Sequence, residues 1–451
     1  MFTSINPFTQ ETIAEYAAHT PEQIEQKLQL GHKAYRELLQ VSLEQRRQWM
    51  MQVAQSMKDN ADEHAALITR EMGKTLKEAR AEVLKCATSA EYYAENIVEM
   101  LAHKPIGSDA YKSYVSYEPK GIILAIMPWN FPYWQVFRFA IPNILAGNTG
   151  ILKHASNVSG CALAIEKIFT ESNFPAGTFQ SLLISSKDIE PVIADHRVQG
   201  VTLTGSTPAG KSVAALAGKY IKKTVLELGG SDPFIVLKDA DLEAAAKTAV
   251  QGRMQNAGQS CIAAKRWIVE KDIVPAFTAA VKRILQDLKQ GDPTQESTQM
   301  GPMARPDLAE ELAKQLQDSI RQGAKLELGG THEGCNFAPT LLTGVTNKMT
   351  AFKEETFGPL AVIIEAADET DAIALANETE FGLGAALWTS DLDKAAKLAT
   401  QIESGNVFIN AMVRSDARLP FGGVKQSGYG RELSLEGTHE FLNVKTVYIQ
   451  Q

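Results

Sequence analysis

The chain has 451 residues, of which 44% are hydrophobic and 22% are charged, and its formal net charge is -8. A chain of this length exceeds the size at which a single hydrophobic core stops growing, so we expect two or more packed units. The acidic balance argues against a nucleic-acid partner, because phosphate binding needs clustered Lys and Arg.

No apolar run approaches the roughly 18 residues of a membrane helix, so we expect no membrane partner. The opening residues, MFTSINPFTQET, lack the basic and apolar segments of a secretory leader, which predicts a cytoplasmic protein. The cysteines, Cys86, Cys161, Cys261 and Cys335, are widely spaced and form no CxxC pair. We therefore expect free thiols and no bound metal.

The first long segment, residues 20–101, predicts helices. Thr20 can cap the first of them, Pro21 suits the first helical position, and Gln23 completes a capping box. The next stretch, residues 111–119, alternates apolar or aromatic residues with polar ones. This alternation predicts a strand with one covered face, or an edge that pairs with another subunit.

Short apolar runs follow, separated by segments of helical length. They are GIILAIM (121–127), TGILK (149–153), FQSLLIS (179–185), GVTLTG (200–205) and TVLEL (224–228). Continuous rather than alternating apolar runs are typical of strands buried on both faces. They predict a parallel, doubly wound sheet of βα units, which is a Rossmann-like domain.

The pattern restarts after residue 229, and WIVEKDI, LAVIIEA and GNVFINA are its further strands. The tail, residues 439–451, returns to alternation and could pair with the earlier edge segment or with a neighbouring protomer. The fold class is therefore α/β, with a small β oligomerisation element that suits a homodimer or a homotetramer. We assign residues 1–101 and 120–229 to a Rossmann-like cofactor domain, 230–427 to a catalytic domain, and 102–119 and 428–451 to the oligomerisation element.

Two segments after strands carry polar residues suited to binding or proton transfer. In GSTPAG, a strand runs into Gly205 and Gly210 and then into a helix, where backbone N–H groups can bind phosphate, although the spacing is not GxGxxG and a plain turn is the alternative. Glu227 ends an apolar strand before a Gly-Gly turn, where desolvation raises a carboxyl pKa toward that of a general base. The alternative for Glu227 is a salt-bridged residue at a strand end.

Two further segments could supply a nucleophile and its partner. In PWNFP, Asn130 lies in a loop between prolines, where its amide could donate to an oxyanion or simply form a turn. Cys261 lies in a Gly- and amide-rich loop, with cations four and five places downstream. Such a setting suits an accessible thiolate, whereas the alternative is a small buried apolar residue.

In combination, PWNFP, LELGG and GQSC resemble the aldehyde dehydrogenase superfamily, and GSTPAG, EETFGP and PFGGVKQSGYGRE extend the resemblance over nearly the whole chain. The resemblance implies that the Cys261 thiolate attacks the aldehyde carbon, while the Asn130 amide and the Cys261 N–H hold the oxyanion. A nicotinamide accepts the hydride, and Glu227 activates the water that hydrolyses the thioester.

The resemblance also implies cofactor contacts. Glu355 matches the residue that holds the nicotinamide-side ribose, with Phe357 beside it, and Lys153 matches the contact to the adenosine ribose. Trp129 and Ser206 match residues along the diphosphate, beside Gly205. NAD-preferring members often carry Glu where this chain has Ser156, and that Glu repels a 2′-phosphate. We therefore predict a preference for NADP, with NAD as a possible cofactor.

For the substrate, Arg138 lies eight residues after Asn130, as in the succinate-semialdehyde dehydrogenase branch, and a guanidinium binds carboxylates in a fork. Ser415 matches a Ser of that branch, and Arg414 and Arg418 are further candidates. Against this, Gln255 stands where the branch often has Arg, and a solvated helix face is the alternative for Arg138.

The predicted reaction is the oxidation of succinate semialdehyde, a small anionic aldehyde, to succinate. An aldehyde dehydrogenase of broader medium-chain or aromatic specificity is the alternative, since Trp134 and Phe137 follow the Asn130 loop. A retired family member with a structural or binding role would be expected to have lost its nucleophile or base, and this chain keeps both. Ala263 replaces the second cysteine that some members carry, so no local disulfide switch is expected.

Overall fold

The predicted apolar runs form the first sheet of the computed structural model, which describes residues 1–451. The sheet order is β21 (Gly428–Tyr429), β9 (Lys223–Glu227), β8 (Val198–Thr204), β5 (Ile122–Met127), β6 (Thr149–His154) and β7 (Phe179–Ser181). All neighbours are parallel except β21, which pairs antiparallel with β9. The carboxyl ends of the parallel strands therefore share one edge, where ligands of such sheets bind.

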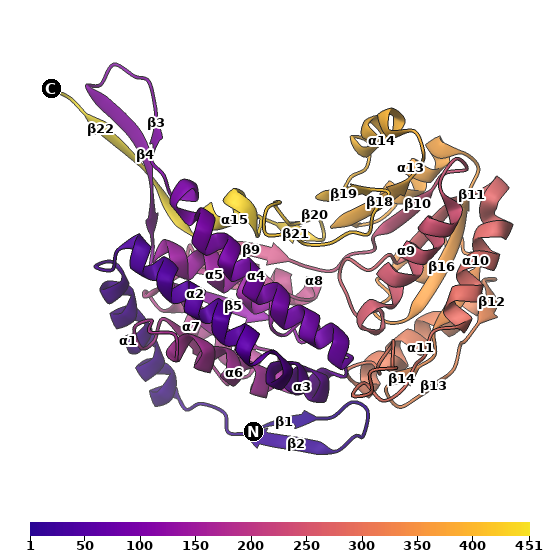
Figure 1. Ribbon diagram of the computed structural model, residues 1–451, viewed down its shortest axis with the longest axis horizontal. Helices are drawn as coiled ribbons and strands as arrows, with labels where there is room; N and C mark the ends of the chain where they lie inside the picture. Colours follow the sequence, from indigo (N-terminus) through magenta and orange to yellow (C-terminus); the bar gives the residue numbers. More distant parts are fainter.

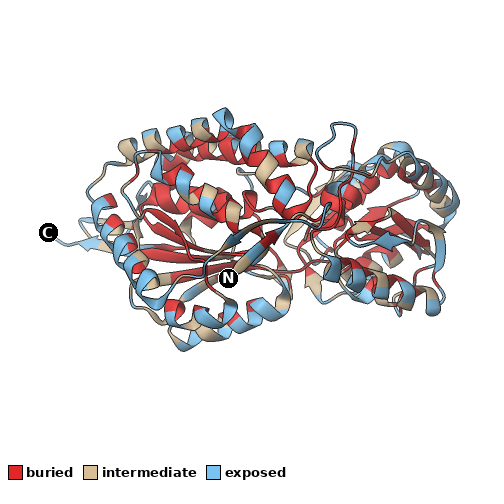
Figure 2. Cartoon of the chain, turned by 90° about the horizontal axis from the view of Figure 1, so that it is seen from below, coloured by how far each residue is buried: buried red, intermediate tan, exposed pale blue.

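Helices cover both faces of this sheet, as predicted for a doubly wound fold (Figures 1 and 2). One face carries α2 (Leu43–Asp59), α3 (Ala61–Met72), α4 (Leu76–Met100), α5 (Trp134–Ala146) and α6 (Ser159–Thr170). The other carries α1 (Pro21–Leu38), α7 (Ile189–Ala194) and α8 (Thr207–Lys219). The predicted capping box begins α1, since the Thr20 side chain accepts from the Gln23 N–H and the Gln23 side chain accepts from the Thr20 N–H.

The second sheet lies beside the first unit (Figure 1). Its order is β12 (Lys325–Leu328), β15 (Thr340–Thr343), β16 (Leu360–Ala366), β11 (Arg266–Glu270), β10 (Pro233–Val236), β18 (Gly384–Trp388) and β19 (Asn406–Ile409). One face packs against α9 (Leu242–Met254) and α10 (Val274–Gln286). The other packs against α11 (Pro306–Arg321), α13 (Glu369–Asn377) and α14 (Leu392–Ala399).

A three-stranded arm projects from the first unit (Figure 1). It consists of β3 (Lys104–Pro105), β4 (Lys112–Pro119) and β22 (Leu442–Ile449). The tail pairs antiparallel with the early edge segment along its whole length, from Leu442 opposite Pro119 to Ile449 opposite Lys112. Apolar side chains remain exposed on the arm, among them Tyr111, Val444 and Tyr448.

The arm is smaller than the predicted oligomerisation element, which also included residues 428–441. In the structure, β21 extends the first sheet and α15 (Ser434–His439) packs against α5. Gly428 explains the difference, because its φ is +111° and a Cβ there would lie 1.9 Å from the Leu226 carbonyl oxygen. Only glycine allows the chain to approach β9 so closely.

An N-terminal hairpin was not predicted. It consists of β1 (Phe2–Ile5) and β2 (Thr12–Tyr16) and runs beneath both units (Figure 1). Ser4 donates to Glu71 of the first unit (2.6 Å), and Gln10 donates to the Cys335 sulfur of the second (3.4 Å). None of the helices is both long and apolar enough to cross a membrane.

Candidate active site

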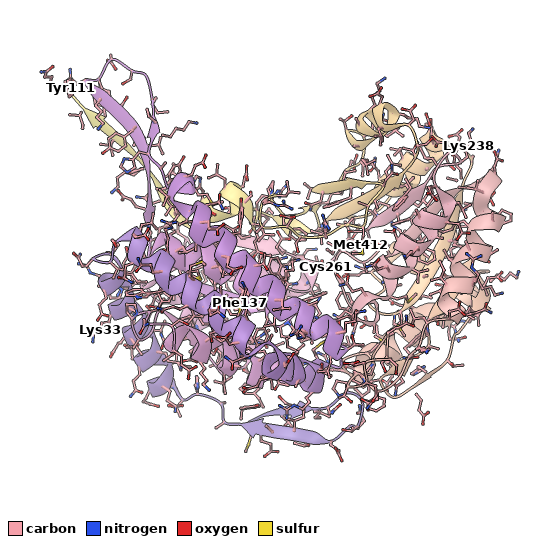
Figure 3. All side chains as sticks on the ribbon, viewed as in Figure 1. Lys33, Tyr111, Phe137, Lys238, Cys261 and Met412 are labelled. Carbon is pink, nitrogen blue, oxygen red and sulfur yellow. The ribbon has the colours of Figure 1, made fainter.

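A cavity of about 410 Å³ lies where the two units meet. It brings together seven of the predicted residues, namely Trp129, Asn130, Gly205, Ser206, Cys261, Glu355 and Phe357. The labelled Cys261 lies between the two units in Figure 3. Residues without a recognisable motif also line the cavity, among them Gln135, Arg305, Glu311 and Gln315. Arg305, at the start of α11, lies 5.8 Å from the Trp129 ring.

Cys261 is half-buried, and the loop before it is unusual. Asn256 and Ala257 have positive φ angles of 55° and 51°, and a Cβ on Gly258 would lie 2.2 Å from the Gly358 carbonyl oxygen. Burial raises the pKa of the Cys261 thiol to about 12, although the positive charges of Lys265 and Arg138 act to lower that pKa. The sulfur is thus a thiol at neutral pH in this conformation, and its attack on a carbonyl needs a proton acceptor.

Lys265 connects the Cys261 loop to Glu355. Its buried amine donates to the Gly230 carbonyl oxygen and to the Cys261 carbonyl oxygen (2.9 Å), and it pairs with Glu355 (2.7 Å). Glu355 also accepts from the Gly230 N–H (3.0 Å), and a Cβ on Gly229 would lie 2.4 Å from its carboxylate. The sequence signal for Lys265 was its place four residues after Cys261, but its partners could not be inferred from that spacing.

Asn130 is buried and fixed by the Cys261 loop. Its side-chain amide donates to the Gln259 carbonyl oxygen (3.1 Å), and the Asn256 amide donates to the Asn130 carbonyl oxygen (2.8 Å). A side-chain amide has two N–H groups, so one remains for a further acceptor. Because Asn130 and Cys261 line the same cavity, an oxyanion formed at the sulfur has this donor within the site.

Glu227 ends β9 and is buried, and neither of its carboxylate oxygens has a hydrogen-bond partner. Burial raises its pKa well above the ordinary value, opposed by the charge of Arg138. A Cβ on Gly422 would lie 2.8 Å from one of its oxygens. Glu227 does not line the cavity, although Leu228 and Gly229 do. In this conformation the side chain is therefore held beside the site, not in it.

Arg138, the predicted substrate-binding residue, is buried on α5. It does not line the cavity, its side chain is 2% exposed, and it forms an ion pair with Glu432. It also donates to Thr204 (3.4 Å) and stacks 4.9 Å from the Phe421 ring. In this conformation the charge of Arg138 is compensated by Glu432, and its role toward a substrate carboxylate stays a prediction. The alternative of a solvated helix face is wrong, because every residue of α5 is buried.

Ser415 is buried and accepts from two side chains, the Lys85 amine (2.8 Å) and the Trp134 indole N–H (2.9 Å). Of the further candidates, Arg418 forms a two-point ion pair with Asp416, whereas Arg414 is exposed. Lys85 belongs to no recognisable motif, so sequence analysis could not single it out.

Lys153 and Ser156 lie outside the cavity lining, at the carboxyl end of β6. Lys153 is half-buried, forms no salt bridge with any carboxylate, and has a pKa lowered by burial. Ser156 is exposed and begins the turn before α6. An uncompensated cation beside an exposed hydroxyl fits the 2′-phosphate of NADP. No cluster of His, Cys, Asp and Glu has an arrangement suited to a metal ion.

Comparison with known proteins matches residues 1–447 to the aldehyde dehydrogenase family. A Synechocystis protein described as a probable succinate-semialdehyde dehydrogenase [NADP(+)] is 49% identical over 449 residues, covering 99% of each chain. Succinate-semialdehyde dehydrogenase [NADP(+)] 1 of Mycobacterium tuberculosis is 48% identical over 454 residues, again covering 99% of each. Among solved structures, succinic semialdehyde dehydrogenase from Streptococcus pyogenes in complex with NADP+ is 37% identical, with a TM-score of 0.98 and full coverage of both chains.

Proposed function

Because this chain belongs to the aldehyde dehydrogenase family, we propose that it oxidises succinate semialdehyde to succinate with NADP as the hydride acceptor. The observation that carries the proposal is the cavity between the two units, which contains Cys261, Asn130 and Glu355. Relatives with 48–49% identity over 99% of the chain bear the name of this activity, which supports the choice of substrate.

The roles of the residues follow from their chemistry. The Cys261 thiol gives its proton to solvent water and its sulfur bonds to the aldehyde carbon, so that the C=O π electrons move to the oxygen. The free N–H of Asn130 stabilises that oxyanion. The nicotinamide, when bound, supplies the acceptor for the hydride that leaves that carbon. Cys261 then holds the acyl group as a thioester. Glu227, moved from its pocket beside Gly422, takes a proton from the water that releases the acid and regenerates the thiol.

The cofactor would lie along the carboxyl edge of the first sheet. Glu355, fixed by Lys265 and the Gly230 N–H, is placed to accept from ribose hydroxyls at the cavity. Lys153 and Ser156 would bind the 2′-phosphate at the other end. We infer that the first unit binds the cofactor, while the loop before β11 of the second supplies Cys261.

The arm is our candidate for self-association into a homodimer or homotetramer. Its exposed Val444 and Tyr448 are apolar surface on an edge structure, which commonly pairs with a second copy. Light scattering of the whole chain would measure the mass, and a monomer at micromolar concentration would contradict this assignment.

Comparing succinate semialdehyde with an uncharged aldehyde as substrates tests the function. We expect kcat/KM for succinate semialdehyde with NADP to exceed that for uncharged butanal by at least about tenfold, since a charged hydrogen bond is worth about 1.5–3 kcal/mol. Equal values would favour the broader aldehyde specificity.

Trp134 and Phe137 were the residues that suggested this broader specificity. Phe137 is buried inside the first unit, where its ring stacks on Tyr133 and Phe169 (Figure 3).

Cys261→Ala tests the chemistry. Turnover should be abolished, while NADPH binding, followed by fluorescence, should stay within about threefold of the wild type. Surviving dehydrogenase activity would refute the nucleophile assignment and would reopen a role as a binding protein.

A further inference from the structure

Two carboxylates on α4 reach the two loops of the active site, the loop of Asn130 and the loop before Cys261. Glu78 and Glu82 are four residues apart, so they lie on the same face of the helix. Glu78 is half-buried, and its carboxylate accepts from the backbone N–H of Asn256 (2.8 Å), which lies 178 residues further along the chain. Neither carboxylate has a part in the chemistry proposed for the sulfur.

The N–H that Glu78 accepts belongs to the strained part of the Cys261 loop. Asn256 and Ala257 both have left-handed backbone, with φ angles of 55° and 51°, and this conformation is unfavourable for residues other than glycine. It persists only where the surroundings hold it. Asn256 is buried, so without Glu78 its N–H would be left unpaired away from water, which is costly.

The side chain of Asn256 extends this contact to the oxyanion donors. Its amide donates to the carbonyl oxygens of Asn130 (2.8 Å) and Gln259 (3.1 Å). The Asn130 amide donates to the same Gln259 oxygen (3.1 Å), and Gln259 lies two residues before Cys261. A rotation of the Asn256 peptide would therefore shift both the Asn130 amide and the loop that carries the sulfur.

Glu82 fixes the other loop from the same helix face. Its carboxylate accepts from the backbone N–H groups of Tyr133 (2.9 Å) and Trp134 (3.0 Å). These groups follow Asn130 at the start of α5. The buried Lys74 amine pairs with Glu82 and compensates its charge. One helix of the first unit thus holds both loops, by a carboxylate in each case.

The contact of Glu78 depends on the length of its side chain. Its second oxygen accepts from the Thr75 hydroxyl (2.9 Å), while the cap of α4 is independent of the carboxylate, because the Thr75 side chain accepts from the Glu78 backbone N–H (3.3 Å). A neutral amide oxygen at the same place would also accept the Asn256 N–H. A carboxylate one methylene shorter would be withdrawn from it.

We propose that Glu78 is a positioning residue for the reaction at Cys261: by accepting the Asn256 N–H, it holds the strained loop in the conformation that aligns the sulfur with the Asn130 amide. The inference rests on the proposed function, because the step that it serves is the attack of the sulfur on an aldehyde. The two units then share the assembly of the oxyanion site, since α4 belongs to the first unit and the Cys261 loop to the second.

Two substitutions separate the reach of the side chain from its charge. Glu78→Gln keeps the length and an acceptor oxygen, whereas Glu78→Asp keeps the charge and shortens the side chain. Stopped-flow absorbance would measure the single-turnover rate of NADPH formation from succinate semialdehyde. We expect this rate to stay within about threefold of the wild type in Glu78→Gln and to fall about 30-fold in Glu78→Asp, because small misplacements of reacting groups are costly. KM for succinate semialdehyde and the affinity for NADPH should stay within about threefold in both variants, since the lost alignment acts on the transition state.

Glu270→Asp is the matched control. Glu270 also accepts a backbone N–H, that of Lys238, but it does so at the end of β11 away from the Cys261 loop. Urea unfolding should show a similar loss of stability in Glu270→Asp and Glu78→Asp, and only the second should lose the rate.

Three results would overturn the proposal. A wild-type rate in Glu78→Asp would mean that the contact only supports packing, and an equal fall in Glu78→Gln and Glu78→Asp would mean that the charge acts instead of the hydrogen bond. A parallel fall in NADPH affinity would place the effect in the cofactor cavity. These results leave the proposed function intact, whereas a wild type that forms no NADPH from succinate semialdehyde defeats both.

Discussion

Replacing Ser156 by Glu is expected to reverse the choice between NADP and NAD. Ser156 is exposed at the turn before α6, three residues after the uncompensated Lys153. In the first turn of α6, the N–H groups of Gly160 and Cys161 are already bonded to Glu71 (2.9 and 2.8 Å). A 2′-phosphate at this edge therefore depends on Lys153 and Ser156, and a carboxylate at position 156 acts on it directly.

The magnitude follows from Coulomb's law. Two unit charges about 4 Å apart interact by about 1 kcal/mol in water and by about 4 kcal/mol at the effective dielectric of a protein surface. Because Ser156 is exposed, the lower end applies, and because a phosphate carries about 1.5–2 charges, a penalty of about 2 kcal/mol results. That penalty is a loss of about 30-fold in kcat/KM for NADP. The new Glu could also accept from the ribose 2′-OH of NAD, which adds a gain of about three- to tenfold.

The assay compares kcat/KM for the two cofactors at saturating succinate semialdehyde, in wild type and in Ser156→Glu. We expect the NADP-to-NAD ratio to fall by about 100-fold, and to fall less as salt screens the repulsion. Ser297→Glu, the same change at an exposed serine of the second unit, should leave the ratio unchanged. A wild type that prefers NAD tenfold, or a variant whose ratio moves less than threefold, would refute the electrostatic argument.

The remaining predictions concern the general base and the stability of the fold in acid. Glu227→Gln should retain hydride transfer but lose hydrolysis of the thioester. Stopped-flow absorbance should then show a burst of about one NADPH per active site, followed by slow turnover. Full steady-state activity of this variant would exclude Glu227 as the base. Burial lowers the pKa of His154 to about 4, below its value of 6.5 when unfolded, so the neutral form stabilises the fold above pH 6.5 and stability is lost as pH falls. At pH 5 the loss should be about 2 kcal/mol in urea unfolding relative to pH 7, and His154→Gln should remove that loss.

Much of the fold could be predicted because it depends on local patterns. The buried strands of the first sheet show as continuous apolar runs, and the start of α1 shows as Thr20, Pro21 and Gln23. The hairpin β1–β2 and the strand β21 were missed, because short strands carry weak periodicity and their pairing depends on partners far along the chain.

The residue types of the site could be identified from local motifs. Cys261, Asn130 and Glu355 belong to motifs whose residue types are nearly sufficient to identify them, and all of them line one cavity. Which charges are already compensated depends instead on contacts between distant segments. Arg138 is paired with Glu432 and Lys85 meets Ser415, and these partners lie hundreds of residues apart in the chain. A charge is available to a substrate only if no other part of the protein has already compensated it, and that depends on packing in three dimensions.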